Sequence, residues 1–291
     1  MPGILWDPSA DDAPAQPAPP GLPEVESEFC VLSSSSSGNC SVLITGSGRL
    51  RRITLIDCGL SPLRTRTLLA RLGLGFDLID EVLVTHLDSD HVHPSWARAL
   101  PRHARFRLHA AHADQAARHG VPLPAHEPFD GSFVLACGVS VAPTALVHDE
   151  WGVTAYRLFA ANWSLGYATD IGRPSRRLVS AMAGVDVLAI ESNYCPAMQE
   201  ASGRPEFLKK RIMGGRGHLS NAQCADAVRA IAPGSHVVLL HLSRQCNTPD
   251  LARAPHASAA YDLTVAHPQR PTPLIGLSRS VSKARAPGGP A

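Results

Sequence analysis

Residues 85–91, with the sequence THLDSDH, bring two imidazoles and two carboxylates into one short stretch. The four side chains belong to His86, Asp88, Asp90 and His91. Carboxylates that converge repel each other and are costly to bury, and a divalent cation removes both penalties. The stretch therefore indicates a metal site, with a solvent-exposed loop rich in Asp and His as the alternative.

Three more residues of ligand type each follow an apolar, strand-like run. His148 follows residues 141–147, Asp170 follows residues 163–169, and His241 follows residues 236–240. A single histidine in such a position is more often structural. Active sites of layered α/β proteins lie at strand ends, so this repeated placement favours one shared site. We therefore expect metal ligands at His86, Asp88, Asp90, His91, His148, Asp170 and His241.

The elements that position these residues alternate along the chain. Apolar and β-branched runs predict strands at residues 29–32, 41–45, 53–57, 81–85, 139–147, 154–160, 163–169, 185–190 and 236–240. Helical spacing predicts helices at residues 62–72, 94–100, 178–182 and 220–231, the last with Ser220 as its N-cap. Such alternation indicates a layered α/β domain.

Composition and length favour one large domain between two tails. The chain has 291 residues, of which 44% are hydrophobic, and a net charge of +2. This charge excludes a strongly basic protein, but a local basic patch can still bind nucleic acid. Residues 1–25 are rich in Pro, Ala, Asp and Gly, and we expect a disordered leader there. We expect the domain at residues 26–267 and a loose tail at residues 268–291.

The sequence also carries information about the compartment. No apolar run follows a basic N-terminal region, and no stretch of about 18 apolar residues could span a membrane. The seven cysteines are odd in number and form no CxxC pair. We therefore expect free thiols, a cytoplasmic protein and no membrane partner.

Six further motifs carry a resemblance to a known family. They are SSSGNC at residues 35–40, LIDCG at 55–59, GYATD at 166–170, ESN at 191–193, GHLSN at 217–221 and HLS at 241–243. Together with the metal motif, they make residues 28–265 similar to the metallo-β-lactamase fold superfamily, in particular its WalJ/YycJ/VicX branch. The ESN and GHLSN motifs are more specific to this branch than the metal motif is.

The resemblance implies a single-domain αββα four-layer sandwich with two divalent metal ions, Zn²⁺ or Mn²⁺. One ion would be bound by His86, Asp88 and His148. The other would be bound by Asp90, His91 and His241, with Asp170 between the two. Asp57 would orient a ligand loop without touching metal.

Asp88 departs from the superfamily pattern, which usually has His at this position. A third carboxylate would raise the pKa of metal-bound water and favour harder cations such as Mn²⁺ over Zn²⁺. The alternative is that Asp88 points away and leaves this part of the site weak or empty.

A pair of metal ions suits phosphodiester hydrolysis, because it can hold a bridging hydroxide and contact both the attacking and the leaving oxygen. We expect a phosphodiesterase or nuclease, and the resemblance implies 5′-to-3′ exonuclease action on DNA. Asp90 and His218 are the expected catalytic residues. A basic cluster at residues 204–216 also favours a phosphate substrate, although it could equally be a solvated helix face. The expected substrate-binding residues are Ser36, Ser37, Asn39, Asn193 and Asn221.

Three other functions remain open on the same residues. The same metal site could hydrolyse small cyclic phosphodiesters or thioesters, because the motif alone does not choose the substrate. A non-catalytic, metal-binding regulatory protein is the third alternative, although retention of every other ligand argues against it. The sequence does not indicate an oligomeric state.

Overall fold

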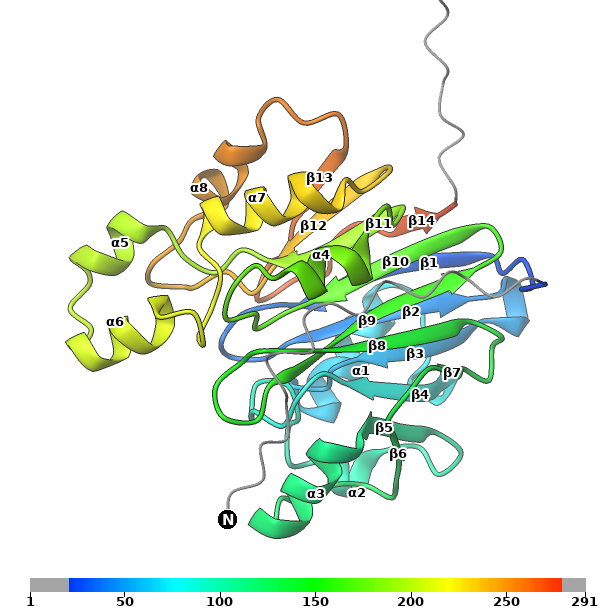
Figure 1. Cartoon of the computed structure of the whole chain (residues 1–291). Helices are drawn as coiled ribbons and strands as arrows, with labels where there is room; N and C mark the ends of the chain where they lie inside the picture. Colours follow the sequence, from blue (N-terminus) through cyan, green and yellow to red (C-terminus); the bar gives the residue numbers. More distant parts are fainter. Residues whose placement is uncertain (1–20, 279–291) are drawn as a thin grey trace, which may run out of the picture.

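Two mixed β-sheets face each other in the computed structural model, which describes residues 21–278 (Figure 1). Within those residues, the first sheet has the strand order β14-β1-β2-β3-β4-β5-β6. Its strands are β1 Ser27–Ser33, β2 Cys40–Thr45, β3 Arg52–Ile56, β4 Ile79–Val84, β5 Arg105–His109, β6 His126–Phe129 and β14 Ile275–Leu277.

The second sheet has the order β13-β12-β11-β10-β9-β8-β7 in the described part of the chain. Its strands are β7 Phe133–Val134, β8 Ser140–Leu146, β9 Val153–Ala160, β10 Trp163–Ala168, β11 Val187–Glu191, β12 His236–Leu240 and β13 Asp262–Val265. The strands β10 to β13 run parallel to one another, so their carboxyl ends lie at one edge.

Helices cover the outer face of each sheet. The first sheet carries α1 Pro62–Arg71, α2 Trp96–Ala99 and α3 Ala110–His119, and the second carries α4 Arg176–Met182, α7 Asn221–Ile231 and α8 Pro249–Arg253. Two further helices, α5 Pro196–Ala201 and α6 Glu206–Met213, project sideways from the sheets (Figure 1). Short 3-10 turns lie at Gly48–Leu50, Phe76–Leu78 and Ala254–His256.

Alternating side chains divide the core into layers. In β2, Leu43 points between the sheets, whereas Val42 and Ile44 pack under the helices of the first sheet. In β11, Ala189 points between the sheets and Ile190 packs under α4 and α7. Because strand side chains alternate between faces, each buried strand supports two layers of core. The expected αββα four-layer sandwich in a single domain is confirmed.

The predicted strands and helices are all present, with bounds that differ by a few residues. Ser220 is the predicted N-cap of α7, and its hydroxyl accepts a hydrogen bond from the backbone N–H of Gln223 at 3.2 Å. The Gln223 side chain in turn accepts one from the backbone N–H of Ser220 at 2.9 Å, which completes a capping box.

The expectation of a loose tail from residue 268 needs correction. Residues 275–277 form β14, which pairs with β1 and places Ile275 opposite Phe29. Both Ile275 and Leu277 are buried in the central core layer, which explains why this segment is part of the fold. The expected tail residues beyond 278 and most of the expected leader, residues 1–20, lie outside the described residues. No helix of the described chain has the length and apolar character of a membrane span.

Candidate metal centre

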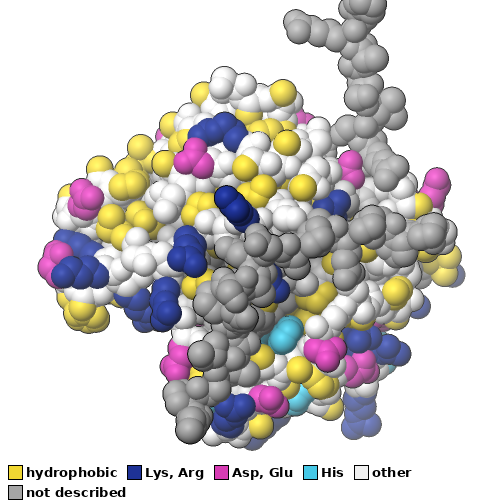
Figure 2. Space-filling model, viewed as in Figure 1, with side chains coloured by type: hydrophobic (Ala, Val, Ile, Leu, Met, Phe, Trp, Pro, Cys, Tyr) yellow, Lys and Arg dark blue, Asp and Glu magenta, His cyan; other side chains and the backbone are white. Residues whose placement is uncertain are grey.

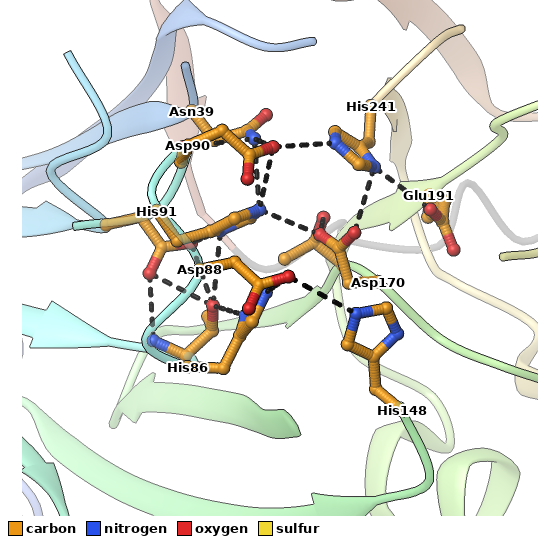
Figure 3. Close-up of polar contacts among 12 residues, drawn as sticks. Asn39, His86, Asp88, Asp90, His91, His148, Asp170, Glu191 and His241 are labelled. Carbon is orange, nitrogen blue, oxygen red and sulfur yellow. Dashed lines mark hydrogen bonds and ion pairs between the residues drawn. The ribbon is translucent and has the colours of Figure 1, made fainter. Parts of the chain in front are cut away.

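The predicted ligand residues converge at the carboxyl ends of strands from both sheets (Figure 3). Three groups have ligand atoms that all lie within 4.8 Å of one another. They are His86 with Asp88 and His148; Asp90 with His91 and His241; and His86 with His91 and Asp170. The first two groups match the two expected triads, and Asp170 lies beside both.

His91 occupies the centre of the cluster. Its Nδ1 donates to Asp57 Oδ2 at 2.7 Å, and its Nε2 lies 2.9 Å from Asp170 Oδ2. Asp57 also accepts a hydrogen bond from the backbone N–H of Thr85 at 2.8 Å. Burial alone would lower the pKa of His91, but the Asp170 and Asp57 carboxylates outweigh it and raise the pKa well above its usual value.

Asp88 points toward two imidazoles rather than away from them. Its Oδ2 lies 3.7 Å from His86 Nε2 and 4.0 Å from His148 Nε2, although 58% of its side chain is exposed. The contact with His86 lowers the pKa of Asp88 to about 2, against the opposing effect of partial burial. Asp88 is therefore ionised over the whole physiological pH range.

A fourth group includes a residue that the sequence analysis did not select. Glu191, at the end of β11, joins Asp170, His218 and His241 within the same 4.8 Å limit. Its Oε1 lies 2.7 Å from His218 Nδ1 and 3.1 Å from His241 Nδ1. Its Oε2 accepts from the backbone N–H groups of Ile171 and Leu219 at 2.9 and 3.1 Å. This buried carboxylate therefore aligns two imidazoles of the site.

The donor set fits divalent cations. His86 Nε2 is buried and makes no hydrogen bond with any described residue, yet it faces Asp88. In His91 and His148, the Nδ1 atom is held by a group outside the cluster. His91 Nδ1 contacts Asp57, and His148 Nδ1 contacts the carbonyl oxygen of Gly217 at 3.0 Å. Histidines that bind metal usually donate their second N–H in this way. Convergent imidazoles and carboxylates with their free atoms directed inward are suited to Zn²⁺ and Mn²⁺.

The backbone is strained where it turns into the site. Asp57, Asp170 and His241 adopt positive φ values of 62°, 50° and 54°, and each lies one or two residues beyond the end of a strand. Non-glycine residues in this region cost of order 1–3 kcal/mol each and are concentrated at functional sites. The sharp left-handed turn brings each side chain back over the strand ends.

The predicted substrate-binding residues have different surroundings. The Asn39 amide donates to Asp90 Oδ2 at 3.2 Å and so holds a predicted ligand. Ser36 and Ser37 are exposed on the loop beside it. The Asn193 amide donates to the carbonyl oxygen of His241 at 2.7 Å.

Asn221, unlike Asn39 and Asn193, has hydrogen-bond partners that are not predicted metal ligands. Its side chain is buried and accepts hydrogen bonds from Ser192 Oγ at 2.8 Å and Asn247 Nδ2 at 2.9 Å. These hydrogen bonds hold neighbouring loops together, and contact between Asn221 and substrate stays a prediction.

The basic cluster at residues 204–216 lies on α6 and its flanking loops. Lys and Arg side chains gather on the face where α5 and α6 meet the sheets (Figure 2). Arg211 is paired with Asp149, the neighbour of His148, and this contact raises the pKa of the arginine. Lys209 is paired with Glu206 at 3.1 Å. The cluster is therefore partly neutralised.

Two facing sheets with helices outside, and imidazoles and carboxylates at their strand ends, define a hydrolase of the metallo-β-lactamase type. A family model described as the beta-lactamase superfamily domain matches residues 51–242, well over half of the chain. The chain belongs to this superfamily. The expectation of a hydrolase of this superfamily is thereby confirmed, and its fold implies the use of divalent metal.

Two curated relatives carry names that describe an activity. The chain is 28% identical over 247 residues to exodeoxyribonuclease WalJ of Streptococcus pneumoniae, and the match covers 79% of this chain and 87% of the relative. It is 28% identical over 235 residues to exodeoxyribonuclease YycJ of Bacillus anthracis, with 77% and 86% covered.

Solved structures show the same fold at lower identity. The metallo-β-lactamase fold protein YhfI of Bacillus subtilis has a TM-score of 0.62 at 15% identity, and the match covers 85% of this chain and 99% of that one. A diphosphatase of the PhnP family has a TM-score of 0.58 at 16% identity, with 88% and 100% covered. The short form of human tRNase Z has a TM-score of 0.54 at 14% identity, with 84% and 98% covered.

Proposed function

We propose that this chain is an exonuclease that hydrolyses DNA phosphodiester bonds, in the 5′-to-3′ direction, with two divalent cations. The observation that carries the proposal is the pair of ligand triads, His86–Asp88–His148 and Asp90–His91–His241, with Asp170 beside both. The two curated relatives named exodeoxyribonucleases support nucleic acid as the substrate. Zn²⁺ and Mn²⁺ both suit this set of nitrogen and oxygen ligands.

Paired cations would supply Lewis acidity and an activated nucleophile. The protein's own task is to hold the ligand atoms in place. Asp57 and Glu191 do so from outside the cluster, because each accepts hydrogen bonds from an imidazole and from backbone N–H groups. Asp90 is the proposed catalytic carboxylate: its side chain is 22% exposed, and its Oδ2 lies 3.3 Å from His241 Nε2 and 3.7 Å from His91 Nε2.

His218 is the proposed proton donor to the leaving oxygen. Its side chain is 21% exposed, whereas that of His241 is 2% exposed, so His218 is the more accessible to substrate. Burial would lower its pKa, but the Glu191 carboxylate outweighs burial and raises the pKa above its usual value. A protonated imidazole at this position can donate to an oxygen or bind a phosphate oxygen.

A reducing compartment, with the cytoplasm as our proposal, fits the thiols. All seven cysteines, which lie within the described residues, are unpaired. Persistent disulfides are a feature of oxidising compartments.

The proposed function can be tested with purified protein stripped of metal and reloaded with Mn²⁺ or Zn²⁺. Substrates are end-labelled duplex DNA, single-stranded DNA, RNA, bis-p-nitrophenyl phosphate and a thioester. We expect mononucleotides released from the 5′ end of DNA, and no activity in an Asp170→Ala control. Thioester cleavage without any phosphodiester cleavage would contradict the proposal.

A further inference from the structure

A pocket is bordered by the run of serines at residues 33–37, which we call the serine loop. It has a volume of about 360 Å³, and its lining includes Ser35, Ser37, Gly59, Arg64, His93 and Arg244. Ligand pockets run from about 300 to 1,000 Å³, so this one can hold a group the size of a nucleotide. We call it the end pocket.

The charges in the end pocket are of one sign. Arg64 comes from α1 on the first sheet, and Arg244 comes from the loop after β12 of the second. No Asp or Glu of the described chain contributes to the lining. The N-terminal end of α1, capped by Ser61, also borders the pocket, and helix N-termini favour anions.

The two guanidinium groups have donors to spare. Within residues 21–278, Arg64 Nη2 makes one hydrogen bond of 3.5 Å to the carbonyl oxygen of Gln269. Arg244 Nη1 likewise makes one of 3.4 Å to Ser37 Oγ. A guanidinium has five N–H donors, so most of them can bind a ligand. His93 adds another donor, because its Nδ1 accepts from the backbone N–H of Ser95 at 3.2 Å and its proton is therefore on Nε2.

The end pocket and the metal loop are in direct contact. Gly59, at the pocket wall, packs so closely that a methyl group on it would lie 1.7 Å from the carbonyl oxygen of Asp90. Asn39, which follows the serine loop, contacts the same residue: its backbone N–H donates to the Asp90 carbonyl oxygen at 2.7 Å. The end pocket therefore adjoins the metal loop through the backbone of Asp90.

We propose that the end pocket binds the terminal phosphate of the strand being degraded, and so makes a phosphorylated end the place where cleavage begins. A terminal phosphomonoester carries a charge of about −1.5 to −2 at pH 7, against −1 for an internal phosphodiester. Two arginines and an imidazole donor match the monoester better than the diester. This inference rests on the proposed nuclease function and identifies the substrate class of the same site.

The test uses one DNA sequence with a 5′-phosphate, a 3′-phosphate or hydroxyls at both ends. Cleavage by the wild-type protein is compared with that by Arg64→Ala, Arg244→Ala and the double variant. Arg71→Ala, at the far end of α1, is the matched control. Hydrolysis of bis-p-nitrophenyl phosphate reports on the metal cluster alone.

We expect the wild type to prefer the strand with a 5′-phosphate, because the proposed cleavage begins at the 5′ end. Each arginine removed should lower kcat/KM for that substrate about tenfold or more. This loss should exceed the loss on bis-p-nitrophenyl phosphate at least tenfold, and Arg71→Ala should match the wild type. Equal losses on all substrates, or a wild type indifferent to terminal phosphates, would overturn the inference.

A binding measurement separates this inference from the proposed function. Fluorescence anisotropy of the labelled strands is recorded in excess chelator, so that no cleavage occurs. Phosphate-dependent binding that is lost in the double variant supports the end pocket even if the protein cleaves no DNA. DNA cleavage without any dependence on terminal phosphate leaves the nuclease function intact and rejects the end pocket.

Discussion

Asp57 Oδ2 lies 2.7 Å from His91 Nδ1, and both side chains are completely buried. The contact connects the end of β3 with the loop after β4 and leaves His91 Nε2 directed toward Asp170. A buried carboxylate therefore sets both the orientation and the tautomer of a proposed ligand.

Asp57→Asn should weaken metal binding while leaving the fold intact. The amide keeps the size of the side chain but removes its charge, and changes to such supporting groups typically cost 10- to 100-fold in metal affinity. Competition with a chromophoric chelator measures the affinity, and circular dichroism checks the fold. Unchanged affinity would show that His91 needs no support from Asp57.

His218→Ala should reduce turnover far more than metal content. Loss of a general acid or of a phosphate-binding donor costs about 10²–10⁴-fold in rate. Metal analysis and kcat are measured on the same preparation, with Glu191→Gln as a companion variant that perturbs both His218 and His241. Loss of metal in parallel with activity would reassign His218 as a ligand, for which its group with Asp170, Glu191 and His241 leaves room.

Asp88→His should shift the metal preference from Mn²⁺ toward Zn²⁺. The wild type presents an ionised carboxylate at this position, and its replacement removes one negative charge and adds a softer nitrogen ligand. Activity is titrated with each ion for the wild type, Asp88→His and Asp88→Asn. A wild type that works only with Zn²⁺ would contradict this explanation of Asp88.

Metal uptake should release protons at pH 8. Burial would lower the pKa of His241, but Asp170 above all outweighs burial and raises the pKa to about 10 in the metal-free protein. A bound cation must displace this proton, so apparent metal affinity should rise with pH. An indicator dye in weak buffer measures the release, and His241→Gln should release fewer protons than the wild type.

The same shift has a consequence for stability without metal. The pKa in the folded protein exceeds the usual value of about 6.5, so the contribution of His241 is fully present below pH 6.5 and is lost as the pH rises toward 10. The free energy of unfolding of the metal-free protein should decline across this window, as measured in urea. A flat profile in both experiments would show that His241 is already neutral at pH 7.

Gly59→Ala should damage the metal loop. The added methyl group would lie 1.7 Å from the Asp90 carbonyl oxygen and 2.8 Å from the His91 nitrogen, and backbone atoms cannot rotate away. We expect a destabilisation of about 1–3 kcal/mol and a lower metal content. Gly131→Ala is the control, because its methyl group would meet no atom within 4 Å. Equal melting temperatures for the two variants would contradict the close packing at Gly59.

The sequence predicted the site best where an apolar strand ends directly before a ligand residue. Residues 81–85 and 236–240 have continuous apolar runs that predict buried strands, and their positions determine where His86 and His241 lie. The same signal was available for Glu191, which ends the apolar run of β11 and begins the ESN motif, but a lone carboxylate there has no partner visible in the sequence.

Other features depend on contacts between distant residues. β14 and β1 lie near opposite ends of the described sequence but pair with each other. Nothing local in the three residues of β14 predicts that pairing. β6 contains Pro128 and exposed polar residues, which argue against a strand. His112 is completely buried on the inward side of α3, where the carbonyl oxygen of Gly152 accepts from its Nε2 at 3.2 Å, and this contact with a distant loop has no local signal in the sequence.

The proposed ligands are divided between the two halves of the sandwich. Loops of the first sheet carry His86, Asp88, Asp90 and His91, and loops of the second carry His148, Asp170 and His241. Cations held between them would act as removable cross-links, and each would stabilise the native state in proportion to the logarithm of its free concentration. Chelation would then lower the free energy of unfolding as well as stop catalysis, and the metal-free chain, although still held by the core between its sheets, would be cut faster by proteases.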